Sequence, residues 1–187
     1  ARHIKGDRKD GKEAHDDGVD CLTMTVELRG KHDNDMKYYN GGQEGKRIAF
    51  VMPDNEGKFI LLNVVVNEYI NVVDVVYQHG FDVDLMKERL KGMDDIVFEC
   101  DKAFFPMARE LRGECDVRIM HKNTNPMLRM SAQKSFITDK VRYRDDYDEF
   151  AQYTAFMDAV LDENNSFEAM DAISAMSVYI QKKWFNG

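Results

Sequence analysis

A glycine-rich stretch ahead of a lysine, NGGQEGK at residues 40–46, is the first feature of the chain that could carry chemistry. Such a loop cradles phosphates in nucleotide enzymes when its spacing follows G-x-x-x-x-G-K-[ST] and a helix follows it. Here Asn40 stands where the first glycine is required, and Arg47 stands where a serine or threonine is required. Strand-like runs lie on both sides, so we interpret the stretch as a connection in a sheet whose glycines permit positive backbone angles.

Clusters of carboxylates are the second candidate, because hard divalent cations take oxygen ligands. Acidic residues cluster at 33–35, 82–84 and 145–149. The spacing of a calcium loop is absent around Gly57, where Met52 occupies the first ligand position. Acidic residues also favour the first turn of a helix, and Asp84 is predicted to cap one. We therefore predict no metal ligand, no cofactor and no catalytic residue.

Two tripeptides of the same sequence, at 99–101 and 114–116, place a cysteine between a glutamate and an aspartate. With His121 six residues beyond the second cysteine, they could form a zinc or thiol site. Structural zinc usually takes paired ligands two to four residues apart, and here each cysteine stands alone. We therefore interpret the cysteines as thiols, mostly buried, in a reducing compartment. They are Cys21, Cys100 and Cys115.

Basic residues gather in one part of an otherwise acidic chain. The net formal charge is −8, yet residues 117–144 hold seven basic side chains against the single Asp139, a net charge of +6. Folding can gather these side chains into one patch that suits a phosphate backbone or an acidic protein, or it can scatter them among the chain's own acidic regions. The predicted phosphate-binding or acidic-partner residues are Arg118, Lys122, Arg129, Lys134, Lys140, Arg142 and Arg144.

The composition is that of a globular protein. The chain has 187 residues, of which 43% are hydrophobic and 32% charged, enough for one substantial core. Its longest apolar run, at 59–66, is strand-sized and far shorter than the roughly 18 residues of a membrane-spanning helix. The polar N-terminus lacks the apolar centre of a secretion signal. We expect no membrane partner and a location in the cytoplasm or within an assembled particle.

The elements that must position these residues are strand-like in the first part of the chain. The PDNEG turn at 53–57 predicts an antiparallel hairpin, with Gly57 in the left-handed conformation. Apolar residues from Tyr69 to Tyr77 recur at helical spacing and predict a helix. Strands are predicted at 21–28, 36–39, 47–52 and 58–66, from their β-branched and aromatic residues.

The second part of the chain alternates between helices and strands. Short helices are predicted at 84–92 and 106–113, strands at 96–100 and 115–121, and a long loop at 122–136. Two C-terminal helices follow. Aromatic residues recur at helical spacing over 143–161, and Ser166 is a candidate cap for the second helix.

The predicted fold is α+β: an N-terminal, mainly antiparallel sheet with short helices, followed by a C-terminal α-helical hairpin. We predict a polar arm at 1–20, an α+β domain at 21–136 and the hairpin at 137–187, packed on the same domain. Trp184 and Phe185 are predicted partner contacts.

Because no catalytic motif is intact, the sequence favours a non-catalytic structural or assembly subunit of a larger complex, such as a viral or phage particle, with protein subunits as partners. The alternatives are a nucleic-acid-associated accessory protein that uses the basic residues at 118–144, and a metal-dependent phosphoryl-transfer or hydrolytic enzyme built on the acidic clusters.

Overall fold

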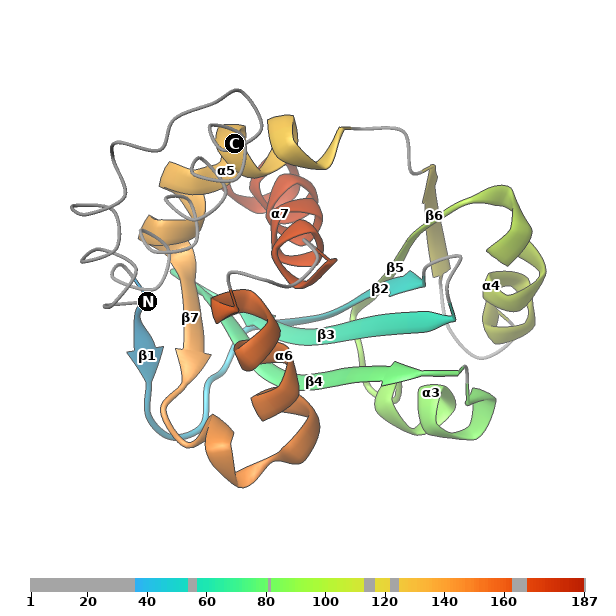
Figure 1. Cartoon of the computed structure of the whole chain (residues 1–187), viewed down its shortest axis with the longest axis horizontal. Coiled ribbons are helices and arrows are strands. Elements are labelled where there is room, and N and C mark those ends of the chain that lie inside the picture. Colours follow the sequence, from blue (N-terminus) through green and yellow to red (C-terminus); the bar gives the residue numbers. More distant parts are fainter. Residues whose placement is uncertain are drawn as a thin grey trace, which may run out of the picture.

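A mixed sheet forms the centre of the protein (Figure 1). The computed structural model describes residues 36–53, 57–80, 82–112, 117–121, 125–162 and 168–186. Within these ranges seven strands pair in the order β1-β7-β4-β3-β2-β5-β6, and helices accompany them, so the predicted α+β class is confirmed. The strands are β1 (Tyr38–Tyr39), β2 (Lys46–Pro53), β3 (Lys58–Val66), β4 (Ile70–His79), β5 (Asp95–Cys100), β6 (Val117–His121) and β7 (Val141–Arg144).

The middle of the sheet is an antiparallel meander of β2, β3 and β4. The predicted β2–β3 hairpin is confirmed, with Lys46 opposite Val66 and Pro53 opposite Phe59. Gly57 has a φ of +88°, the left-handed conformation that its turn requires. Parallel pairing flanks the meander, since β5 lies parallel to β2 and to β6, while β7 lies parallel to β4 and to β1.

The helix predicted from Tyr69 to Tyr77 is wrong, because residues 70–77 of this segment lie in β4. Val72 and Val75 join the core on one face of the sheet, whereas Val76 joins the core on the other face. A strand that is buried on both faces reads as a nearly continuous apolar run without alternation. Its valines happen to fall at helical spacing, although β-branched side chains favour strands.

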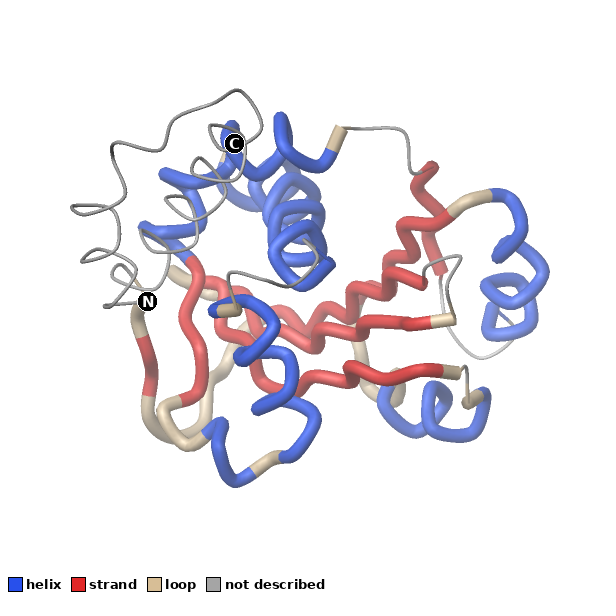
Figure 2. The backbone as a smooth tube through the Cα atoms, in the orientation of Figure 1, coloured by secondary structure: helices blue, strands red, loops and turns tan. Residues whose placement is uncertain are grey.

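Helices cover both faces of the sheet (Figure 2). The larger core lies between the sheet and α5, α6 and α7, and the smaller one lies between the sheet and α3 and α4. The α-helices are α3 (Val83–Arg89), α4 (Phe105–Arg112), α5 (Pro126–Lys140), α6 (Ala151–Leu161) and α7 (Glu168–Ile180). Shorter helical turns are η1 (Lys102–Phe104), η2 (Tyr147–Glu149) and η3 (Gln181–Phe185), the last being a π-helical turn that continues α7.

Three helix predictions need correction. Residues 126–136, predicted as loop, lie in α5, which begins after the capping residue Asn125. The first C-terminal helix begins at Ala151, and Tyr143 lies in β7 instead. The cap of α3 is Asp82 and not Asp84, because the Asp82 side chain accepts a hydrogen bond from the Leu85 amide. The two C-terminal helices themselves are confirmed as α6 and α7.

Several predictions lie outside the described residues: the arm at 1–20, the strand at 21–28, Ser166, Cys21 and Cys115. Among the described helices, none combines the length and apolarity that crossing a membrane requires.

Candidate functional site

A buried arginine joins two buried carboxylates where β5, α5 and α7 meet. Arg129 Nη1 donates to both carboxylate oxygens of Glu99, at 2.7 Å to Oε1 and 2.9 Å to Oε2. Its Nη2 and Nε donate to Oδ1 of Asp171, at 2.6 and 3.2 Å. Arg129, Glu99 and Asp171 are 7%, 3% and 4% exposed. These three residues, called the acid–arginine triad below, place one positive charge between two negative ones.

Each member of the triad is positioned by the end of an element. Glu99 is the penultimate residue of β5. Arg129 lies in the first turn of α5, which Asn125 caps by accepting from the Met127 amide at 2.9 Å. Asp171 lies in the first turn of α7, where the helix dipole favours an acid. The same dipole disfavours a cation at the start of α5, so the two carboxylates must hold Arg129 there.

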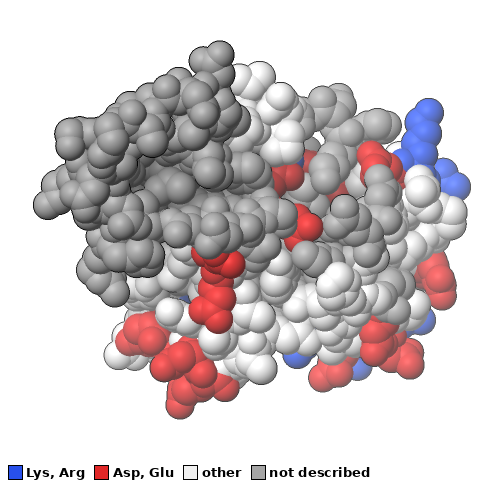
Figure 3. Space-filling view, in the orientation of Figure 1, with Lys and Arg blue, Asp and Glu red and all other residues white. Residues whose placement is uncertain are grey.

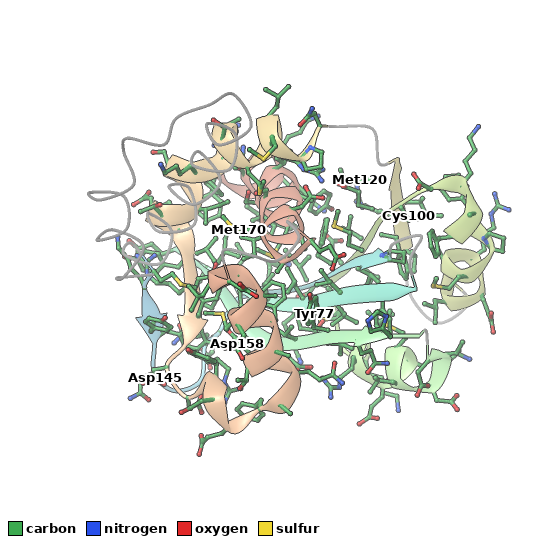
Figure 4. All side chains as sticks on the ribbon, viewed as in Figure 1. Tyr77, Cys100, Met120, Asp145, Asp158 and Met170 are labelled. Carbon is green, nitrogen blue, oxygen red and sulfur yellow. The ribbon has the colours of Figure 1, made fainter. Side chains whose placement is uncertain are left out.

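The triad lies at the end of β5, beside the point where the chain connections that follow two neighbouring strands run in opposite directions along the sheet. From β2 the chain continues to β3 on one side, whereas β5, parallel to β2, leads to β6 on the other side. In open sheets ligands bind outside the carboxyl ends of the strands at such a switch point. Glu99 lies at this end of β5, opposite Met120 of β6, and Figure 4 labels Met120 and Cys100 on these two strands.

The surroundings keep Arg129 charged and make the neighbouring thiol unreactive. Burial by itself lowers the pKa of Arg129, but the hydrogen bonds and charges of Asp171 and Glu99 outweigh it and raise this pKa above its ordinary value. Burial, and then the charges of Asp101 and Glu99, raise the pKa of the Cys100 thiol to about 11. Such a thiol is protonated near neutral pH and is a poor nucleophile, so Cys100 does not suit thiol chemistry.

The predicted basic residues do not share one surface. Arg129 is buried in the triad, and Lys122 lies outside the described residues. Arg118 is exposed on β6 at one edge of the sheet, whereas Arg142 and Arg144 lie on β7, near the opposite edge. The face in Figure 3 shows no continuous basic patch among its described residues. Binding of phosphate or of an acidic partner by these residues stays a prediction.

Two members of the basic set do meet, around an aromatic ring. The guanidinium carbon of Arg142 lies 4.0 Å from the ring centroid of Tyr69, and Lys140 Nζ lies 5.8 Å from the same centroid. Lys140 Nζ is also 5.2 Å from the ring centroid of Phe185. Lys134 lies partly buried on α5. The structure thus brings Lys140 and Arg142 together at the junction of α5 and β7.

The C-terminal aromatic residues pack against their own chain. Trp184 and Phe185 are partly buried beside the larger core. The ring centroid of Trp184 lies 6.0 Å from that of Tyr179, and the centroid of Phe185 lies 5.6 Å from that of Phe136. Their role as partner contacts stays a prediction.

The predicted acidic clusters take structural roles where they are described. Asp82 caps α3, and the cluster at 33–35 lies outside the described residues. In the cluster at 145–149, Asp146 accepts from Arg144 Nε at 2.8 Å and from Nη2 at 2.9 Å, and these hydrogen bonds lower the pKa of Asp146. Across the described ranges, no three or more histidine, cysteine or acidic side chains gather as a metal site.

Sequence reasoning misses the triad because its members lie far apart in the chain. Glu99 is 30 residues from Arg129, and Asp171 is 42 residues from it. Glu99 enters the predictions only as a neighbour of Cys100, and Asp171 is not among the predicted site residues. One signal is present, since Asp171 interrupts the apolar segment AMDAISAM of α7. A charged side chain on a buried helix face needs a partner, but the sequence does not say which one.

No protein-family model matches the chain, and no curated protein matches it significantly. The function must therefore be argued from the geometry and chemistry of the site.

Proposed function

We propose that the protein is a metal-dependent phosphoryl-transfer or hydrolytic enzyme that acts on phosphate esters. The observation that carries this proposal is the convergence of Glu99 and Asp171 on one guanidinium, at the carboxyl end of β5. Carboxylates at a sheet's switch point are suited to a divalent cation, and an arginine is suited to phosphate oxygens.

A donor set of two carboxylates fits Mg²⁺. Mg²⁺ keeps several waters and is usually bound through one or two carboxylates together with substrate phosphates. Glu99 and Asp171 supply two carboxylates, which are hard oxygen donors. A bound cation would polarise a phosphoryl oxygen and stabilise the charge that develops on it.

Arg129 has two roles in this proposal. It orients both carboxylates, because its Nη1 bonds Glu99 while its Nη2 and Nε bond Asp171. Its planar guanidinium can also bind a substrate phosphate in place of one carboxylate, since both groups accept two hydrogen bonds from a guanidinium. Substrate phosphate at Arg129 would release oxygens of Glu99 or Asp171 for the cation.

The two other expectations stay predictions with less support. The assembly hypothesis depends on an arm at 1–20 outside the described residues, and on Trp184 and Phe185, which pack on their own chain. The nucleic-acid hypothesis depends on a basic patch, and its members Arg118 and Arg142 lie toward opposite edges of the sheet. The triad, by contrast, lies entirely within the described residues.

Calorimetry with Mg²⁺ and Mn²⁺ tests the proposal, together with hydrolysis of bis-p-nitrophenyl phosphate and of double-stranded DNA. We expect saturable metal binding and metal-dependent cleavage of a phosphate ester. Glu99→Gln and Asp171→Asn keep the shape of each side chain and remove its charge. Each should lower activity by about 100-fold or more, because carboxylate ligands that orient a cation act in the transition state.

Asp158→Asn is the matched control, since Asp158 is exposed on α6 and belongs to no part of the triad. It should keep full activity, and circular dichroism should show that all three variants are folded. Absence of metal binding by the unmodified protein, with no cleavage of either substrate, would overturn the proposal. Equal activity of the Glu99→Gln variant and the unmodified protein would also overturn it.

A further inference from the structure

A cleft lies away from the triad, on the face of the sheet that carries α3. Its volume is about 900 Å³, within the usual range for small-molecule sites. Its walls are the loop at 40–45, the start of β2, the end of α3 and the residues after β7. None of the triad residues lines it. Side chains that line the cleft include Arg47, Asn63, Asp74, Arg89, Lys91 and Arg144.

Asn63 lines this cleft and has an unsatisfied acceptor. It is 7% exposed, and its Nδ2 donates to the backbone oxygen of Arg89 at 3.1 Å. Its Oδ1 is the single buried side-chain polar atom without a hydrogen-bond partner among the described residues. A buried acceptor without a donor is costly, and such groups mark places where a ligand can supply the bond.

The pairing of β3 with β4 contains a β-bulge next to Asn63. Asn63 pairs with Asp74, whereas Val64 pairs with Val72, so Val73 is an extra residue in β4. A β-bulge of this kind redirects side chains and is frequent beside functional sites. Val73 and Asp74 both line the cleft.

The charges in the cleft fall into paired and unpaired groups. Arg89 pairs with Asp74, and Arg144 pairs with Asp146. The remaining cations, Arg47 and Lys91, are exposed and have no ion pair within the described part of the chain. Arg47 is held in place because its amide donates to Asp94 Oδ2 at 2.9 Å.

Unpaired acceptors accompany these cations. The exposed side chains of Glu44 and Glu88 line the cleft and form no ion pair within the described ranges. Together with Asn63 they offer acceptors for hydroxyl groups, while Arg47 and Lys91 offer donors for an anionic group. A ligand that satisfies both sets carries a phosphate and several hydroxyls.

The glycine-rich loop forms one wall and is anchored. Asn67 Nδ2 donates to the backbone oxygen of Glu44 at 3.0 Å. A Cβ atom built on Gly41 or Gly42 meets nothing within 4 Å, so open space borders this backbone. The loop lacks the spacing of a nucleotide loop, but its backbone lies beside Arg47, where a ligand could contact it.

We propose that this cleft binds a small sugar phosphate, with its phosphate at Arg47 and Lys91 and its hydroxyls at Asn63, Glu44 and Glu88. The site is independent of the proposed phosphoryl-transfer site, because no residue is shared between the two.

Titration of ribose 5-phosphate into ¹⁵N-labelled full-length protein, followed by amide chemical shifts and by calorimetry, tests this proposal. We expect saturable binding, with shifts concentrated at Gly41, Gly42, Arg47 and Lys91. Ribose and inorganic phosphate, each tested alone, should bind at least about tenfold more weakly, because each satisfies only one set of groups.

Arg47→Gln should weaken ribose 5-phosphate binding by about tenfold or more, since it removes a charge-assisted hydrogen bond. Arg109→Gln is the matched control, because Arg109 is exposed on α4 and lines no part of the cleft, and it should bind normally. Equal binding of inorganic phosphate and ribose 5-phosphate would overturn the sugar assignment. Absence of binding, shifts outside the cleft, or unchanged affinity of the Arg47→Gln variant would overturn the site.

Discussion

Replacing Arg129 with methionine is the sharpest test of the acid–arginine triad. Methionine has an unbranched apolar side chain that replaces the aliphatic part of the arginine side chain. The main change is therefore the loss of the guanidinium. Glu99 and Asp171, which are 3% and 4% exposed, then keep two buried carboxylates without their shared cation. Removing one partner of a buried pair typically costs about 3–5 kcal/mol, because the remaining charge is left uncompensated.

The expected loss lies at the upper end of that range, because Arg129 bonds two carboxylates and not one. A loss of about 5 kcal/mol is a large part of the 5–15 kcal/mol that usually separates folded and unfolded states. The loss should shrink as the pH falls, because the two carboxylates that have lost the guanidinium can bind protons in the folded variant. The folded variant then binds more protons than the unfolded chain, so its stability decreases as the pH rises.

Urea unfolding, followed by circular dichroism at pH 5 and pH 8, measures both effects. The triple variant Glu99→Gln, Arg129→Met, Asp171→Asn is the matched control, because none of the three charges of the triad remains in it. It should recover more than half of the stability that Arg129→Met loses, and it should be less sensitive to pH. A loss below about 1 kcal/mol for Arg129→Met at pH 8 would refute this reasoning, because it is far below the cost of a broken buried pair.

Four further predictions concern other parts of the fold. Burial raises the pKa of Cys100 to about 11, so its thiol should react slowly with iodoacetamide at pH 8 in the native protein and quickly in urea, as measured by peptide mass spectrometry. Because this pKa lies above that of the unfolded thiol, Cys100 should contribute stability below about pH 9 that is lost as the pH rises toward 11, and Cys100→Ala should reduce that loss in alkaline urea titrations. Gly45→Ala should cost about 2–3 kcal/mol by urea unfolding, because the added Cβ would lie 2.2 Å from the backbone oxygen of Val66. Tyr153→Phe should lower the unfolding temperature, with a loss of about 1–2 kcal/mol, because the buried hydroxyl donates to the Val72 oxygen at 2.9 Å.

Local chemistry was sufficient for several elements of the fold. The β2–β3 hairpin follows from two apolar runs around a turn in which Gly57 adopts a φ of +88°. The helix α3 and the strand β5 follow from a short amphipathic segment and a β-branched one. Each of these signals lies within about ten residues of sequence, where propensity and turn chemistry act.

Other elements were decided by burial, which depends on the whole fold. The valines of β4 fit a helix by spacing, and only a sheet covered by helices on both faces makes this segment a strand. Polar residues suggested a loop at 122–136, yet Asn125 and Pro126 start α5 because α7 and the sheet cover its buried side.

The sequence by itself determined the α+β class, the antiparallel hairpin and the uneven distribution of charge along the chain. It also showed that the glycine-rich loop lacks the spacing of a nucleotide-binding loop. Only the tertiary structure decided which charges meet. It buried Arg129 between Glu99 and Asp171, left Arg118 exposed at the sheet edge, and made the glycine-rich loop one wall of a cleft that Asn63 also lines. The physical reason is that charge pairing and desolvation depend on distances between residues far apart in the chain, whereas turns and helix caps depend on their neighbours.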